Sequence, residues 1–124
     1  MKRGKKLGSL SNAEIAAEFD HLCIEQYDAM ERNENNRANR LLWKVNDLEN
    51  ELKSRLGDQR HVLKKLFGHP NMQVRLSAAQ ANLRVDYIAA RQELQAIVDS
   101  KWYPQAAEAS FILRNIDSGF YRPT

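Results

Sequence analysis

The segment from His69 to Leu83 constrains the fold of this chain most strongly, because its apolar residues lie on two sides of a helix. At about 100° per residue, Val74 and Ala78 belong to one stripe, while Leu76 and Ala79 belong to another on nearly the opposite side. A short helix that is apolar on two sides packs between neighbouring helices and does not lie on a surface. The segment therefore predicts a stacked array of helices.

Helix start and stop signals divide the chain into about six helices joined by short turns. The clearest signal is a capping box, in which Ser11 is the N-cap and Glu14 its partner three residues later. Glycines at 57, 68 and 119 predict helix ends, and prolines at 70 and 104 predict helix starts. The expected helices span about residues 12–30, 33–56, 59–67, 70–85, 87–99 and 104–119.

Each expected helix carries an apolar stripe that should face a core. The stripe of the second helix runs from Leu41 to Leu56, and that of the fifth begins at Tyr87. Cys23 and Gln26 fall within the stripe of the first helix, so we expect the thiol to be buried and unreactive. The aromatic residues after position 119 are expected to fold back on the last helix pair.

The last four helices repeat, and this repeat predicts the fold class. Leu63-x-x-Leu66 recurs 31 residues later as Leu94-x-x-Ile97, and a proline opens the second helix of each pair. A period near 30 residues built from helix pairs is typical of α-solenoids. We therefore predict an all-α protein, an αα superhelix of the HEAT or armadillo type with about six helices in three antiparallel pairs, forming a single domain over residues 11–124.

The basic character of the chain comes from its first ten residues. They contain four of the 19 Lys and Arg residues and none of the 16 acids, so the remaining 15 basic and 16 acidic residues leave a net charge of −1. We expect residues 1–10 to be a disordered tail that makes at most weak, salt-sensitive contacts with nucleic acid. One cysteine and the absence of a long apolar run predict a cytoplasmic protein that does not bind membranes.

No set of side chains has the spacing of a catalytic or metal site. His21, His61 and His69 are scattered, and none lies at a metal-ligand spacing from cysteine or carboxylates. The glycines are isolated and form no phosphate-binding loop. We therefore predict a protein that is not an enzyme and that binds no cofactor or metal ion.

Arg75 lies between the two apolar stripes of the fourth helix, as does Asn82. Its side chain should be partly buried and should need an acceptor. Asp58 and Asp86 begin the flanking helices, as their N-caps, and are the candidate partners. We interpret these four residues as structural contacts between repeats.

Trp43 is the most unexpected residue of the second helix. It points about 200° away from Leu41, onto a polar face. A large aromatic side chain among amides is typical of residues that anchor protein interfaces. A neighbouring helix or the N-terminal tail could cover it instead. The predicted partner-binding residues are Trp43, Asn39, Asn46, Asp47 and Asn50.

Two resemblances follow from these motifs. Residues 58–85 resemble a HEAT repeat, whose second helix opens with a proline-asparagine turn followed by Val-Arg and a spaced Ala-Ala-Leu. From about residue 10 onward the chain resembles a bacterial family described as a domain of unknown function and numbered 2019. The shared motifs are Gly57-Asp58-Gln59-Arg60, the His-Pro-Asn run at 69–71, and the Pro-Gln-Ala, Gly and Pro-Thr of the last 21 residues. This resemblance implies a HEAT-like superhelix and no established activity; some small helical families have been suggested to be immunity proteins that neutralise bacterial toxins.

The leading hypothesis is a non-enzymatic protein-interaction module that binds an unidentified protein, as a monomer or a homodimer. A toxin-immunity protein is a specific form of it. One alternative is a nucleic-acid-binding HEAT-like protein, and another is an enzyme whose site lies between helices. Nucleic-acid binding would require a cluster of cations on the folded body. The candidates are Arg37, Arg40, Lys44, Lys64 and Lys65.

Overall fold

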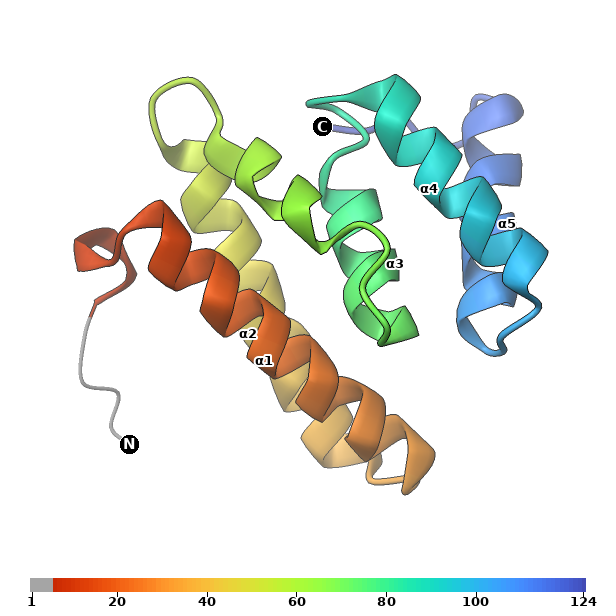
Figure 1. The fold of residues 1–124 in the computed structure, drawn as a ribbon, viewed down its shortest axis with the longest axis horizontal. Helices are drawn as coiled ribbons and strands as arrows, with labels where there is room; N and C mark the ends of the chain where they lie inside the picture. The colour runs from red at the N-terminus through yellow and green to blue at the C-terminus, as the bar shows by residue number, and fades with distance from the viewer. Residues whose placement is uncertain (1–5) are drawn as a thin grey trace. The chain divides into compact units, whose positions relative to one another are not determined.

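The computed structural model describes residues 6–124, and over this range its regular elements are all helices (Figure 1). The predicted all-α class, built from packed helix pairs, is confirmed. The elements are η1 (Leu7–Ser9), α1 (Asn12–Glu31), α2 (Asn35–Ser54), η2 (Gln59–Leu66), α3 (Met72–Ala81), α4 (Tyr87–Ser100) and α5 (Gln105–Asp117), of which η1 and η2 are 3₁₀ helices.

The chain divides into two compact units, whereas the sequence predicts one domain over residues 11–124. Unit 1 ends at Val62, and unit 2 runs from Leu63 to Thr124. The division falls within η2, the third predicted helix, which is a 3₁₀ helix and not an α-helix. Each unit has its own packed helices, so we describe the two separately.

Unit 1 is built on the antiparallel pair α1 and α2, which lie along one another (Figure 1). The predicted capping box opens α1: Ser11 Oγ accepts from the Glu14 N–H at 3.0 Å, and Glu14 Oε1 accepts from the Ser11 N–H at 2.8 Å. The predicted apolar stripes are buried between the helices. Their buried members are Ile15, Phe19, Leu22 and Cys23 of α1 and Leu41, Val45, Leu48 and Leu52 of α2.

The end of α2 differs from the prediction. The helix stops at Ser54, so Leu56 lies in the following turn and is 96% exposed instead of buried. Gly57 and Asp58, in the turn that follows, both have left-handed backbones, with φ of 79° and 49°. An apolar residue at helical spacing therefore lies outside the core, because the helix ends before it.

Unit 2 contains α3, α4 and α5, with α4 packed against both of the others. Asn71 caps α3 by accepting hydrogen bonds from two backbone N–H groups, so α3 begins at Met72. Both predicted stripes of α3 are buried. The shared core of unit 2 comprises Leu76, Ala79, Leu83, Ala90, Leu94, Ile97, Ala109, Ile112 and Leu113.

Two aromatic predictions in unit 2 are corrected. Tyr87 is the first residue of α4 and is exposed, with its hydroxyl accepting a hydrogen bond from Arg91 at 3.3 Å. At the C-terminus the backbone N–H of Tyr121 donates to Asn115 O, and its ring packs against the core as predicted. Phe120, in contrast, is 84% exposed.

Candidate functional site

The candidate site is one face of α2, which we call the α2 face and define as Asn36, Asn39, Arg40, Trp43, Asn46, Asp47 and Asn50. It lies opposite the buried stripe because the two sets of residues are offset by about half a helical turn. Trp43 is at its centre and is 65% exposed. Within unit 1, therefore, no other helix covers Trp43.

The side chains around Trp43 are polar and accessible. Asn39, Asp47 and Asn50 are exposed, and Asn46 is partly buried. Within the described part of the chain, Arg40 and Asp47 form no hydrogen bond or ion pair. All five predicted partner-binding residues therefore lie on one face, together with two that were not predicted, Asn36 and Arg40.

Arg37, one helical turn before Arg40, is engaged within unit 1. Its Nη1 lies 3.0 Å from Asp28 Oδ2 and 2.8 Å from Glu34 Oε1, and its Nη2 lies 3.7 Å from Glu25. Hydrogen bonds from Arg32 and Arg37 hold the pKa of the Asp28 carboxyl below its usual value. Arg37 therefore ties α2 to the end of α1, while Arg40 faces solvent.

Arg75 pairs with Glu93, a residue that the sequence does not single out. Arg75 Nε and Nη2 donate to the two Glu93 oxygens at 2.8 and 3.1 Å, and the Gly68 N–H donates to the same carboxylate at 2.6 Å. Burial by itself would raise the pKa of Glu93, but these hydrogen bonds outweigh it and lower the pKa. The pair joins α3 to α4, across the predicted repeat boundary.

The predicted partners of Arg75 bind other groups. Asp86 caps α4 through the Ala89 N–H and pairs with Lys64 Nζ at 2.8 Å. Asn82 is fully buried at the end of α3, where its amide donates to Ala78 O at 3.0 Å. The expectation that Asp58 or Asp86 would accept from Arg75 is therefore wrong, because Glu93 on the adjacent helix is in direct contact.

Asp58 belongs to a polar cluster of unit 1. The Asp58 carboxylate accepts hydrogen bonds from the Arg60 side chain, from Nε at 2.9 Å and from Nη2 at 2.7 Å. One of its oxygens also accepts from the backbone N–H of Arg60, at the start of η2. Arg60 is buried and reaches Glu49 of α2 at 3.3 Å. Burial raises the pKa of Glu49, while the hydrogen bond from Arg60 lowers that of Asp58.

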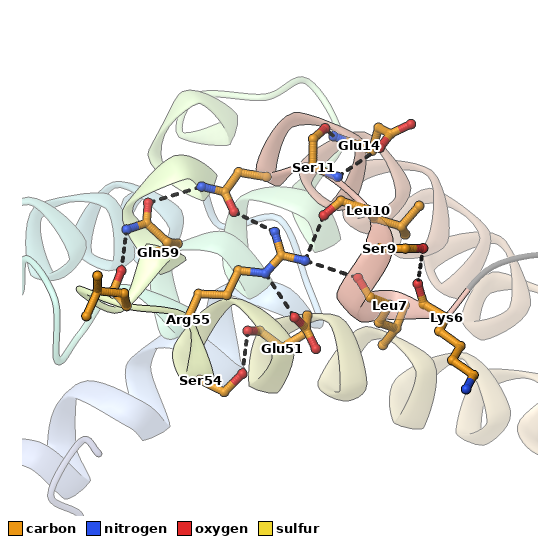
Figure 2. Close-up of polar contacts among 12 residues, drawn as sticks. Lys6, Leu7, Ser9, Leu10, Ser11, Glu14, Glu51, Ser54, Arg55 and Gln59 are labelled. Atoms are coloured by element: carbon orange, nitrogen blue, oxygen red, sulfur yellow. Dashed lines mark hydrogen bonds and ion pairs between the residues drawn. The ribbon is translucent and has the colours of Figure 1, made fainter.

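Arg55 orders the segment that precedes α1 (Figure 2). Its Nη2 donates to the carbonyls of Leu7 at 3.0 Å and Leu10 at 2.7 Å, its Nη1 to Asn12 at 2.8 Å, and its Nε to Glu51 at 2.9 Å. The predicted disordered tail over residues 1–10 is therefore wrong for residues 7–10, and residues 1–5 lie outside the described part of the chain. No local pattern shows the contacts with Leu7, Leu10 and Asn12, because these residues lie more than 40 positions before Arg55.

Two buried glutamines in unit 2 form a second contact that sequence reasoning does not reveal. Gln105 Nε2 of α5 donates to Gln73 Oε1 of α3 at 3.1 Å, and both side chains are buried. Each follows the start of its helix by one residue or less. Aligning the two sequence repeats at the starts of α3 and α5 would have placed Gln73 and Gln105 at nearly the same position, and this is the signal that could have found the pair.

The cations proposed for nucleic-acid binding are divided between the two units. Arg37 is engaged by acids of unit 1, and Lys64 pairs with Asp86 in unit 2. Arg40 and Lys44 lie on α2 in unit 1, whereas Lys65 belongs to unit 2. On each unit, therefore, only some of the five candidate cations are without an ion pair and available to contact phosphates.

The histidines have local partners. His21 lies 2.5 Å from Glu25 on α1, His61 contacts Gln59 at 3.0 Å, and His69 Nδ1 accepts from the Asn71 N–H at 2.9 Å. Among residues 6–124, no group of three or more His, Cys, Asp or Glu side chains is arranged to hold a metal ion, and no helix is long and apolar enough to cross a membrane. Cys23 is buried, as predicted.

The described residues form an all-α protein of packed helix pairs with an exposed tryptophan face. Residues 13–117 match the family model described as Domain of unknown function (DUF2019), and the chain belongs to this family. It is similar to the protein RPA1889 from Rhodopseudomonas palustris CGA009, known from a crystal structure, with 42% sequence identity and a TM-score of 0.94; the match covers 98% of this chain and 100% of that one. A comparison with curated proteins finds no match.

Proposed function

We propose that this protein is a non-enzymatic protein-interaction module that binds its partner through the α2 face. The observation that supports the proposal is the 65% exposure of Trp43 at the centre of a well-formed helix. A tryptophan presents one of the largest apolar surfaces of any side chain, so covering it on binding gives a large favourable free energy.

The residues around Trp43 suit a protein partner. Asparagine amides both donate and accept hydrogen bonds, so they can pair with backbone or side-chain groups of either kind. The face also carries one positive charge on Arg40 and one negative charge on Asp47, neither of which is neutralised within the described residues. An apolar anchor surrounded by polar groups is the usual organisation of a protein interface.

Nucleic-acid binding has weaker support. A phosphate-binding surface needs several cations that are free to contact a backbone. The ion pairs of Arg37 and Lys64 neutralise two of the five candidate cations. No contact among the described residues favours the narrower role of a toxin-immunity protein, which stays a prediction, as does a cytoplasmic location.

A capture experiment with two matched variants tests the proposal. Trp43→Ala removes the proposed anchor, and Phe111→Ala removes a 56% exposed aromatic side chain of unit 2. We expect immobilised wild-type protein and Phe111→Ala to retain the same proteins from a native lysate, and Trp43→Ala to lose them. Thermal unfolding of Trp43→Ala should stay within about 0.5 kcal/mol of wild type, because the side chain is at the surface.

Each other result has a definite meaning. Equal recovery by all three proteins would exclude Trp43 as the anchor. Equal loss from both variants would show that any exposed aromatic side chain produces the same retention, which is nonspecific adhesion and contradicts the proposal.

A further inference from the structure

The α2 face has an internal symmetry about Trp43. Its other residues lie three, four and seven positions before and after Trp43 in the sequence. Asn36 and Asn50 are the outer pair, while Arg40 and Asp47 are its two charged residues. With a rise of about 1.5 Å per residue, Arg40 lies about 4.5 Å before Trp43 along the helix axis and Asp47 lies about 6 Å after it.

The two charges also lie on the same side of Trp43. At about 100° per residue, Arg40 and Asp47 are displaced from Trp43 by about 60° and 40° in one rotational direction. Asn39 and Asn46 are displaced by the same amounts in the other direction. The face thus has a charged edge, an amide edge and a tryptophan at its centre.

From this pattern we infer that the partner of the α2 face is a second copy of this chain, packed antiparallel to the first about a two-fold axis near Trp43. The inference rests on the proposed function, since it identifies the partner of the same surface. A two-fold interface brings one surface patch against itself, so the patch must be complementary to its own rotated copy.

The α2 face meets this requirement at every position. The two-fold rotation reverses the helix direction and keeps each edge on its own side. Arg40 of one copy then lies within about 1.5 Å, along the axis, of Asp47 of the other, and this pairing occurs twice. On the opposite edge Asn39 meets Asn46, and at each end Asn36 meets Asn50.

The alternative orientation lacks this complementarity. In a parallel pair the charged edge of one copy faces the amide edge of the other, so Arg40 lies beside Asn39 and Asp47 beside Asn46. The antiparallel arrangement joins opposite charges twice and brings together no like charges among the seven residues. Because charge pairs select between orientations, the charges favour the antiparallel dimer.

Charge reversal gives a sharp test. Arg40→Asp places aspartate against aspartate twice in the dimer, and Asp47→Arg places arginine against arginine twice. An equimolar mixture of the two variants restores both opposite-charge pairs. Both positions are exposed and form no hydrogen bond or ion pair among the described residues, so neither variant should lose its fold. Lys65→Asp is the control for Arg40→Asp, because it makes the same change from a positive to a negative charge on an exposed residue of unit 2.

Sedimentation velocity over a range of concentrations measures the association. We expect wild type and Lys65→Asp to form dimers with similar Kd, each single reversal to weaken the dimer at least about tenfold, and the mixture to recover it as a heterodimer. Circular dichroism confirms that each variant is folded. Trp43→Ala should also weaken the dimer.

Failure of the inference is distinguishable from failure of the proposed function. A wild-type chain that stays monomeric at every concentration, or a mixture that does not recover the dimer, overturns the second copy as partner. If such a chain still captures another protein in a manner that depends on Trp43, the proposed function stands without the inference. Association with nucleic acid through the α2 face would overturn both.

Discussion

The two units of this protein use their polar side chains in different ways. In unit 1 the side chains of Arg37, Arg55 and Arg60 join elements near their ends, and the middle of α2 carries unpaired groups on its outer face. In unit 2 they lie between helices, as in the pairs of Arg75 with Glu93 and of Gln73 with Gln105. Within unit 1, α1 and α2 pack against each other, so no third α-helix of that unit covers the outer face of α2.

This contrast assigns the two units different roles. In unit 2, α3 is buried on two sides, so its polar residues must be satisfied by neighbouring helices. In unit 1 the outer face of α2 has no such requirement, and surface polar residues are free to serve binding. We therefore expect polar changes between the helices of unit 2 to affect stability, and changes on the α2 face to affect binding.

The largest expected effect comes from breaking the pair between α3 and α4. Glu93→Gln leaves the largely buried Arg75 guanidinium without its counter-charge, so we expect a loss of about 2–3 kcal/mol in the free energy of unfolding. Denaturant titration followed by circular dichroism measures it. Arg91→Gln is the control, because it breaks an exposed ion pair with Asp117 and should cost less than about 1 kcal/mol.

Equal losses from these two variants would show that the partly buried pair of α3 and α4 contributes no more to stability than an exposed ion pair of the same unit, which contradicts the role given to it here. A loss below about 1 kcal/mol from Glu93→Gln alone would show that the glutamine amide replaces the carboxylate as acceptor for Arg75 and Gly68.

A smaller effect is expected from pH. The folded protein lowers the pKa of Glu93 below its usual value of 4.5, so the unfolded chain binds this proton more readily. The stabilisation is complete above the unfolded pKa and is lost as the pH falls through the folded pKa. We therefore expect stability to fall below about pH 4.5, and to fall less steeply in Glu93→Gln. If stability falls with pH equally steeply in the wild type and in Glu93→Gln, Glu93 does not contribute to the pH dependence of stability.

The smallest effect is expected from Arg55, although it makes four hydrogen bonds in unit 1. Arg55→Lys removes the forked donors that hold the carbonyls of Leu7 and Leu10. Since η1 contains no fully buried residue, global unfolding should change by less than about 1 kcal/mol. Amide exchange at residues 7–10 should become faster, while exchange in α3 stays the same. Arg40→Lys, on α2 and without such hydrogen bonds, is the control and should alter neither.

Local motifs could be predicted from the sequence because their partners are a few residues apart. The capping box of Ser11 and Glu14 and the cap at Asp86 need only one turn of chain. The two-sided apolar pattern of α3 likewise requires no knowledge of its neighbours to show that it is buried. The α2 face could be located because Trp43 interrupts a regular polar pattern.

Contacts between distant residues could not be predicted in the same way. The choice of Glu93 over Asp58 or Asp86 as the partner of Arg75 depends on how closely α3 and α4 approach. Leu56 is exposed and not buried as predicted, because α2 ends at Ser54 with an extended residue at Arg55. The contacts of Arg55 depend on chain segments that only folding brings together.

The sequence by itself therefore determined that this protein is all-α, where its helices begin, and which face of α2 is polar, because periodicity and capping act over one or two turns. Only the tertiary structure decided which charges pair, that Leu56 lies exposed beyond the end of α2, and that no other helix of unit 1 covers Trp43. These outcomes depend on distances between side chains on different helices, and such distances are set by packing and not by local pattern.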